Sequence, residues 1–353
     1  MSSDRIDFRP KLPPWIRVKV PCGEQRDHVD ALLKTNSLNT VCRGAQCPNL
    51  CECWHRGTAA FMILGERCTR NCKFCAVGHV EQPLPPDPME PEHLAEAAAK
   101  MKLAFVVVTS VTRDDLPDGG AGHFAKTIQA LKNRIPGVKV EVLVPDFNFV
   151  EKDMRTVLDA GPDVYNHNVE TVERLTPLIR SKAQYRRSLA VLEKAYSITG
   201  GRIPVKSGIM VGMGETDDEV LQTIRDIRAT GATFLTIGQY LTPSKEHWKL
   251  ERYVEPAVFD SWGAYAKEIG FEHVNSGPLV RKELRIRQKE LSAAFLFLFC
   301  HDHGIAFHRG KQYFVSAVHL RKGKFRTVGC GIDSADLLPV QPQNDFKAGN
   351  LTP

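Results

Sequence analysis

The stretch "AFMILGERCTRNCKFC", residues 60–75, joins a short apolar run to three closely spaced cysteines. Cys68, Cys72 and Cys75 are separated by three and then two residues, directly after the first run that is typical of a strand. Three thiolates at this spacing can bind three corners of a cubane iron–sulfur cluster, which leaves the fourth iron open to an outside ligand. The alternative is a zinc site completed by a distant residue, although zinc sites more often contain paired Cys-x2-Cys groups.

The region that follows alternates short apolar runs with amphipathic helical runs. The expected strands cover residues 59–65, 103–111, 138–147, 162–170, 205–214 and 233–241, and the expected helices cover residues 92–101, 123–134, 150–160, 185–197, 216–230 and 257–269. Six βα units in succession predict an α/β fold with a parallel sheet and outer helices. We expect a partial (βα)6 barrel of the TIM type, although periodicity alone does not exclude an open doubly wound sheet. In both folds ligands bind at the carboxyl ends of the strands.

A second cysteine group precedes this region in "VCRGAQCPNLCECW", residues 41–54. Cys42, Cys47 and Cys53 have the spacing Cys-x4-Cys-x5-Cys, and Cys51 lies among them. The N-terminus is acidic and proline-containing and lacks the apolar core of a secretory signal, so we expect a cytoplasmic protein. In such a chain, thiols in this number indicate metal binding or redox chemistry rather than disulfides.

Composition excludes two classes of partner. The net charge of the 353 residues is +6, and no Lys/Arg run with interleaved aromatic residues indicates nucleic-acid binding. No run of eighteen apolar residues is present, so the sequence predicts no membrane span.

The motif at Cys68, placed after the first strand of a barrel, resembles that of the radical S-adenosylmethionine (SAM) superfamily. The upstream cysteine spacing, together with "TSVTRDDLPDGGAGH", "NHNVETV", "KSGIMVGMGET" and "VNSGPLVR", resembles the lipoyl synthase family over residues 10–281. The resemblance implies two [4Fe-4S] clusters, one that cleaves SAM to a radical and an auxiliary one that donates sulfur. The implied ligands are Cys68, Cys72 and Cys75 for the first cluster and Cys42, Cys47 and Cys53 for the second.

The resemblance also implies an activity, that of a sulfurtransferase. It would insert two sulfur atoms at C6 and C8 of a protein-bound octanoyl chain, and it would consume two SAM molecules. The implied partners are octanoylated lipoyl carrier domains, namely the E2 subunits of 2-oxoacid dehydrogenases and the H protein of glycine cleavage. A ferredoxin or flavodoxin reductant and iron–sulfur carrier proteins are implied as well. Another radical SAM enzyme with two clusters is the alternative.

Polar side chains near the carboxyl ends of the expected strands are candidates for SAM binding. In "NHNVE" Asn168 and Glu170 alternate to one face and can reach the ribose or the amine, whereas His167 points the other way and is expected to be structural. Glycines at positions 212 and 214 are expected to let the backbone approach an adenine. The expected SAM contacts are Ser110, Asn168, Glu170, Lys206, Met210 and Gln239.

The resemblance ends at Arg281. In the family "SGPLVR" continues as Ser-Ser-Tyr, and the second serine is a ligand of the auxiliary cluster, whereas here "KEL" follows. The alternative function is therefore a catalytically impaired chain of the same family. The expected domains are an N-terminal cluster-binding extension over residues 1–58, a barrel over 59–281, and an atypical tail over 282–353 that is disordered or aberrant in origin.

Overall fold

The computed structural model describes residues 11–16, 31, 33, 35, 38–40 and 60–280. All of them belong to the first of two compact units of the chain, residues 1–286. The predicted auxiliary-cluster ligands Cys42, Cys47 and Cys53 lie outside the described residues, as does the tail predicted over 282–353.

Within the described residues, eight strands form one sheet in the order β1-β2-β5-β6-β7-β8-β9-β10. Strand β1 is an antiparallel edge, and each later strand runs parallel to its neighbour. The bounds are β1 Asn39–Thr40, β2 Ala60–Ile63, β5 Phe105–Ser110, β6 Lys139–Leu143, β7 Val164–Asn166, β8 Val205–Val211, β9 Phe234–Gln239 and β10 His273–Gly277. A separate pair, β3 Arg67–Cys68 and β4 Gly78–His79, lies in the cysteine segment.

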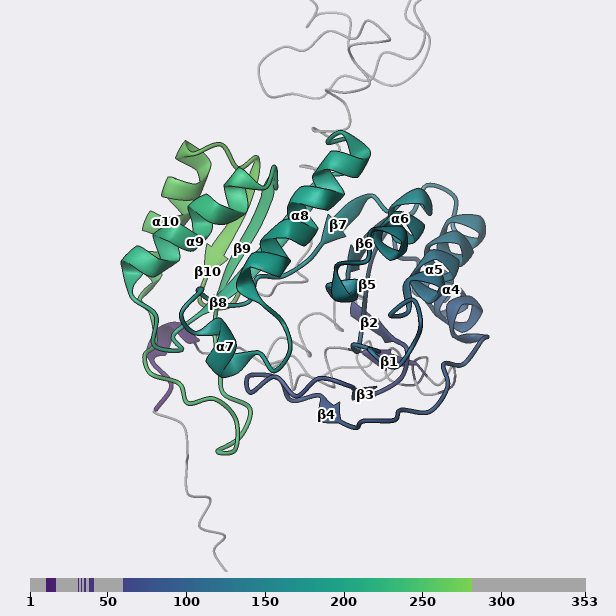
Figure 1. Cartoon of the computed structure of the whole chain (residues 1–353), viewed down its shortest axis with the longest axis horizontal. Coiled ribbons are helices and arrows are strands. Elements are labelled where there is room, and N and C mark those ends of the chain that lie inside the picture. Colours follow the sequence, from purple (N-terminus) through teal and green to yellow (C-terminus); the bar gives the residue numbers. More distant parts are fainter. Residues whose placement is uncertain are drawn as a thin grey trace, which may run out of the picture. The chain divides into compact units, whose positions relative to one another are not determined.

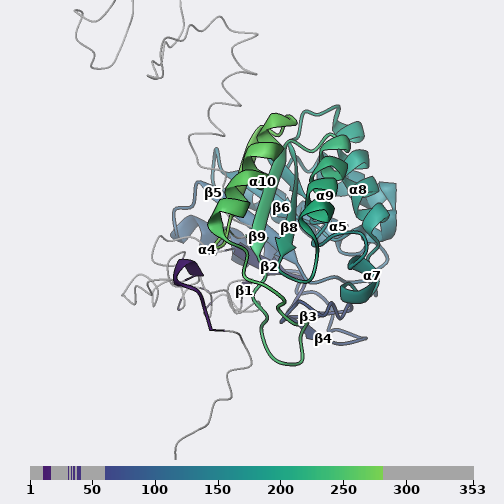
Figure 2. The same cartoon turned by 90° about the vertical axis from the view of Figure 1, so that its left-hand side faces the viewer.

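The long helices follow the strands one by one and lie outside the arc of strands (Figure 1). Seen from the side, α8, α9 and α10 again cover the sheet from one face (Figure 2). No helix in the described part is long and apolar enough to cross a membrane. The helices are η1 Pro14–Ile16, α4 Glu90–Lys100, α5 Ala121–Arg134, η2 Phe147–Phe149, α6 Glu151–Asp159, α7 Thr176–Ile179, α8 Tyr185–Thr199, α9 Asp217–Ala229 and α10 Pro256–Glu268.

This order confirms the predicted α/β partial barrel of six βα units, and it adds a strand that the sequence analysis did not predict. Strand β10 pairs in parallel with β9 from His273 to Gly277. Its five residues are all half-buried, and the sequence "HVNSG" has none of the dense apolar character of the other strands. An edge strand of this kind is not visible to a search for apolar runs.

The two faces of the sheet differ in polarity, and the strand register assigns each residue to one of them. The helix-facing side carries the fully buried aliphatic residues that join the helices in the hydrophobic core. These include Val106, Val108, Val140, Val142, Ile209, Val211, Leu235 and Ile237. The inner side is mixed: Glu141, Asn166 and Lys206 fall on the other register, together with the buried Val107, Val164 and Phe234.

A buried ion pair occupies this inner face. Lys206 Nζ donates to Glu141 Oε1 at 2.7 Å, and the two side chains are 1% and 0% exposed. Asn166 Nδ2 donates to the same oxygen at 3.0 Å. A charge pair this deep is tolerated because each ion neutralises the other, and removal of either partner would leave an isolated buried charge.

Candidate active site

The three cysteines of the barrel region lie on the loop that joins β2 to α4. Cys68 is the last residue of β3. A turn in which the Cys75 N–H donates to the Cys72 carbonyl at 3.0 Å brings Cys72 and Cys75 close together. All three cysteines are half-buried, and none of them is part of a disulfide. Figures 1 and 2 both place β3 and β4 at the same end of the sheet as α7. That end is the carboxyl end of the strands, where the sequence predicted the ligand site.

Hydrogen-bond donors and a positive charge lie around the thiols of this loop. The backbone N–H groups of Arg70 and Thr112 both donate to Cys68 Sγ at 3.3 Å. The buried Arg180 guanidinium interacts electrostatically with Cys72. Within the described residues, no three His, Cys, Asp or Glu side chains converge as ligands of one metal ion. A cubane cluster has a different requirement, because each thiolate binds a different iron, and this donor set fits it.

Backbone hydrogen bonds attach the first half of the cysteine loop to two neighbouring loops of the barrel. The Thr69 N–H and Oγ1 both donate to the Thr112 carbonyl at 3.0 Å, and Thr69 Oγ1 accepts from the Asp114 N–H at 3.0 Å. Further along, the Lys73 N–H donates to the Ile179 carbonyl at 2.8 Å. The loop is thus joined to the segments after β5 and after β7.

The second half of the cysteine loop is attached to the segment between β9 and α10. The Trp248 N–H donates to the Lys73 carbonyl at 2.7 Å, and the Lys73 ammonium lies 5.5 Å from the centre of the Trp248 ring. The His247 ring lies 3.1 Å from the Cys75 carbonyl through Nε2. Contacts from three sides therefore hold the thiols at the mouth of the barrel.

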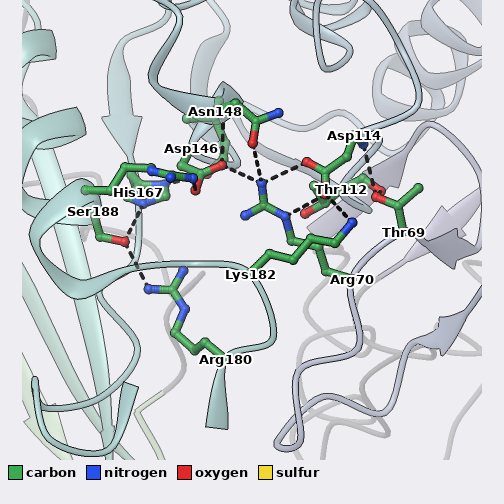
Figure 3. A network of polar contacts seen from close by, with 12 residues as sticks. Thr69, Arg70, Thr112, Asp114, Asp146, Asn148, His167, Arg180, Lys182 and Ser188 are labelled. Carbon is green, nitrogen blue, oxygen red and sulfur yellow. Dashed lines mark hydrogen bonds and ion pairs between the residues drawn. The ribbon is translucent and has the colours of Figure 1, made fainter. Parts of the chain in front are cut away.

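A buried guanidinium completes the attachment (Figure 3). Arg70 donates to both carboxylate oxygens of Asp114, at 2.9 and 2.8 Å, and to Asp146 Oδ1 at 2.7 Å. Burial alone would raise the pKa of Asp146, but the hydrogen bond and the charge of Arg70 outweigh it and lower that pKa to about 2. The same balance raises the pKa of Arg70 despite its own burial. The three groups therefore stay charged at neutral pH.

A second buried cation, Arg180, lies near these charged side chains. Burial lowers its pKa, and its Nη1 donates to the Val169 carbonyl and to Ser188 Oγ, both at 3.0 Å. Its Nε has no hydrogen-bond partner in the part of the chain that the structure describes, and Asp146 and Cys72 act on its charge without a direct hydrogen bond. A buried cation without a direct ion pair is costly, so this arrangement favours an anionic ligand.

His167 has the structural position that the sequence predicted. Its Nδ1 lies 2.9 Å from the Val144 carbonyl, which can only accept, so Nδ1 carries the proton and Nε2 accepts from Ser188 Oγ at 3.1 Å. Burial, and then the charge of Arg180, lowers the pKa of His167 to about 4. The imidazole is therefore neutral in the folded chain.

This burial predicts a pH dependence of stability. Because the folded pKa of about 4 lies below the ordinary value, the unfolded chain takes up the proton first as the pH falls. The stabilisation is complete above pH ~6.5 and is lost between there and pH ~4. Between pH 7 and pH 5 the cluster-free protein should lose about 2 kcal/mol more unfolding free energy than its His167→Gln variant. Urea unfolding at both values of pH tests this, and parallel losses in the two proteins would contradict it.

Two of the predicted SAM contacts are unpaired polar groups. Neither atom of the Asn168 amide has a hydrogen-bond partner among the described residues, although the side chain is 4% exposed, and Ser110 Oγ is likewise buried without one. Glu170 and Met210 lie next to each other, since the Met210 N–H donates to the Glu170 carbonyl at 2.8 Å. Glu170 has the left-handed φ of 76°, and both side chains are half-buried. These four residues fit the binding of a polar ligand at the strand ends.

The other two predicted contacts are engaged within the protein. Lys206 shares the inner face with Met210, as predicted, but its ammonium is bound to Glu141. Gln239 Nε2 donates to three backbone carbonyls, those of residues 211, 240 and 252, and its Oε1 accepts from the Val254 N–H at 2.8 Å. A Cβ at Gly212 would meet Gln239 Nε2 and the Arg252 carbonyl, so this position admits no side chain. The Gln239 side chain therefore holds the segment before α10.

Sequence reasoning missed the groups that hold the cysteine loop in place. Arg70 lies inside the quoted cysteine motif, and a charged residue between ligands was a signal that it has a partner. Asp146 lies in "VPDF", at the carboxyl end of the strand expected over residues 138–147, where ligands gather. Arg180 and Trp248 gave no signal in the sequence, because their roles depend on contacts far apart in the chain.

A parallel sheet of six βα units with three thiols on the loop after its first parallel strand defines the class of radical SAM enzymes. The model of the Radical SAM superfamily matches residues 62–227. Lipoyl synthase of Caldicellulosiruptor saccharolyticus is 52% identical over 271 residues, which cover 77% of this chain and 94% of that protein. Lipoyl synthase of Caldanaerobacter subterraneus is 54% identical over 273 residues, with the same coverage of 77% and 94%. The chain belongs to the lipoyl synthase family.

Among solved structures, the FeFe-hydrogenase maturase HydG from Carboxydothermus hydrogenoformans aligns with a TM-score of 0.48. The sequence identity is 12%, and the alignment covers 68% of this chain and 65% of that one.

Proposed function

We propose that this chain inserts two sulfur atoms, at C6 and C8, into an octanoyl chain that is amide-linked to a lysine of a lipoyl carrier domain. The observation that carries the proposal is the set of three half-buried thiols on a loop attached to the mouth of the barrel. The membership in the lipoyl synthase family supports the same reaction. Two [4Fe-4S] clusters and SAM are the proposed cofactors.

Cys68, Cys72 and Cys75 are the proposed ligands of the radical-generating cluster. When bound, this cluster supplies the electron that cleaves SAM, which is chemistry that no side chain can perform. The chain contributes the setting: two N–H donors on Cys68 Sγ, and a positive charge beside Cys72.

Four groups at the strand ends are the proposed binding site for SAM. Asn168 and Ser110 offer buried polar atoms that have no partner within the described residues, and Glu170 and Met210 lie beside them. We add Arg180, whose buried cation has no direct ion pair in that part of the chain, as the group that binds the SAM carboxylate. Lys206 and Gln239 are proposed to support the site rather than to bind SAM through these atoms, since both side chains are already engaged within the protein.

Cys42, Cys47 and Cys53 are the proposed ligands of the auxiliary cluster, and they lie outside the described residues. The similarity to lipoyl synthases supports this second cluster. The proposed protein partners are octanoylated E2 and H-protein domains, a ferredoxin or flavodoxin, and iron–sulfur carriers. A cytoplasmic location is proposed with them, because thiols stay reduced in that compartment.

The test is a single-turnover assay of the anaerobically reconstituted full chain with an octanoyl-lysine peptide, SAM and a reductant. Mass spectrometry should show the peptide gaining two sulfur atoms while 5'-deoxyadenosine accumulates. A control reaction without the reductant should form neither product.

The same assay separates the two alternatives. SAM cleavage without sulfur gain identifies the catalytically impaired chain that the missing Ser-Ser-Tyr favours, and a repeat with "KEL" at 282–284 changed to "SSY" then tests that cause. SAM cleavage with another substrate identifies a different two-cluster radical SAM enzyme. Failure to cleave SAM at all contradicts the proposed class of reaction.

A further inference from the structure

We propose that Arg70 is a positioning residue that sets the cysteine loop in its binding geometry before any cluster is present. The inference rests on the proposed function, because the loop is taken to be the site of the radical-generating cluster. It goes further because it assigns the positioning of the three thiols to the Arg70 guanidinium and to the two loops that accept its hydrogen bonds.

The first observation is the geometry of the guanidinium (Figure 3). Nε and Nη2 donate to the two oxygens of Asp114 as a fork, and Nη2 donates as well to Asp146 Oδ1 at 2.7 Å and to Asn148 Oδ1 at 3.3 Å. The side chain of Arg70 is only 6% exposed. One residue placed between two cysteine ligands thus joins the loop after β5 to the loop after β6.

The acceptors are themselves fixed. The Asp114 N–H donates to Thr69 Oγ1, so the neighbour of Arg70 in the chain holds the same aspartate from its backbone side. Asp146 is 1% exposed, and its Oδ1 also accepts from the Asn148 N–H at 3.2 Å. A bidentate guanidinium that donates to rigid acceptors is held in one position, whereas one that donates to flexible acceptors moves with them.

The second observation is backbone strain where the guanidinium is received. Phe147, Asn148 and Phe149 have φ values of 45°, 50° and 63°, so three consecutive non-glycine residues are left-handed. Such residues are costly one by one and persist only where surrounding contacts enforce them. Phe147 is buried edge-on against Phe124, with 6.3 Å between ring centres. The result of the strained turn is that Asn148 presents its side-chain oxygen to Arg70.

Other cations near the site cannot take over this task. Lys182 Nζ lies 3.8 Å from Asp114 and is 62% exposed, and Arg187 lies 3.6 Å from Asp146 and is 28% exposed. A lysine at position 70 would carry the charge, but a point charge does not match the bidentate geometry of a carboxylate and a second acceptor together. The fork therefore matters beyond its charge.

The experiment compares Arg70→Lys and Arg70→Met with Arg113→Lys in the full, cluster-free chain. Arg113 is a matched control: its side chain is 1% exposed and pairs bidentately with Asp115, and its Nη1 donates to the Leu64 carbonyl, which lies at the start of the loop and outside the amides 69–75. Hydrogen exchange of amides 69–75 is the first readout. It should be faster by about ten- to a hundredfold in both Arg70 variants and unchanged in the control.

The second readout follows reconstitution. Arg70→Lys should bind the same iron as the parent chain, yet the EPR signal of its reduced cluster should broaden and lose its sensitivity to added SAM, because the open iron is no longer presented uniformly. Parental exchange and a parental signal in Arg70→Lys would overturn the inference, even if Arg70→Met fails to fold. Failure of the parent chain to bind iron would contradict the proposed function instead and would leave the exchange result standing.

Discussion

Replacing Cys68, Cys72 and Cys75 together by alanine should abolish the formation of 5'-deoxyadenosine and leave the reconstituted protein with about one cluster's worth of iron and sulfide. The reason is that these three thiols lie together on one loop, and the described part of the chain offers no other thiol in their place. Chromatography of the reaction mixture measures the first effect, and iron and sulfide analysis measures the second.

The matched control is the alanine replacement of Cys42, Cys47 and Cys53. That variant should also bind about one cluster, but it should still cleave SAM and should transfer no sulfur. Stoichiometric zinc without iron in the parent chain would contradict the cluster assignment. Loss of SAM cleavage in an iron-loaded control variant would contradict the division of labour between the two groups.

Lys206→Met should destabilise the protein by about 3–5 kcal/mol, because it leaves the fully buried Glu141 carboxylate without its counter-charge. The Asn166 amide alone cannot replace an ammonium at 2.7 Å. The double variant Lys206→Met/Glu141→Leu should recover most of the loss, since a well-packed apolar pair often replaces a buried ion pair at little cost. Unfolding in urea, followed by far-UV circular dichroism, measures both values.

Lys249→Met is the matched control for this prediction. Its ammonium lies 3.3 Å from Glu251, but the side chain is 79% exposed, so the loss should stay below about 1 kcal/mol. If Lys206→Met also loses less than about 1 kcal/mol, the Glu141 carboxylate is neutral or hydrated. The double variant Lys206→Met/Glu141→Leu would then be less stable than Lys206→Met alone.

The sequence was sufficient for the elements whose signal is local. The six βα units follow from apolar runs and helical periods, and the three thiols follow from their spacing. Strand alternation also placed His167 on the helix side and Lys206 on the inner side, as the structure does. Alternation determines which face a side chain occupies, but it does not determine what that side chain meets there.

The contacts made across the barrel could not be predicted in this way. Lys206 meets Glu141 from a strand 65 residues earlier in the chain, and Gln239 meets the Val254 N–H of a segment without regular structure. Strand β10 was missed because its residues are half-buried and polar, and Arg70 was missed because its acceptors lie 44 and 76 residues away. In each case the deciding partner is distant in sequence.

The attachment of the cysteine loop to the segment between β9 and α10 has a consequence for the order of events during synthesis. His247 follows Cys75 by 172 residues, so the ribosome must finish most of the barrel before the last support of the loop exists. At ~5–20 residues per second this delay is roughly ten to thirty seconds. During that interval the thiols are already outside the ribosome without their final surroundings, so iron delivery to this site belongs after translation of the barrel.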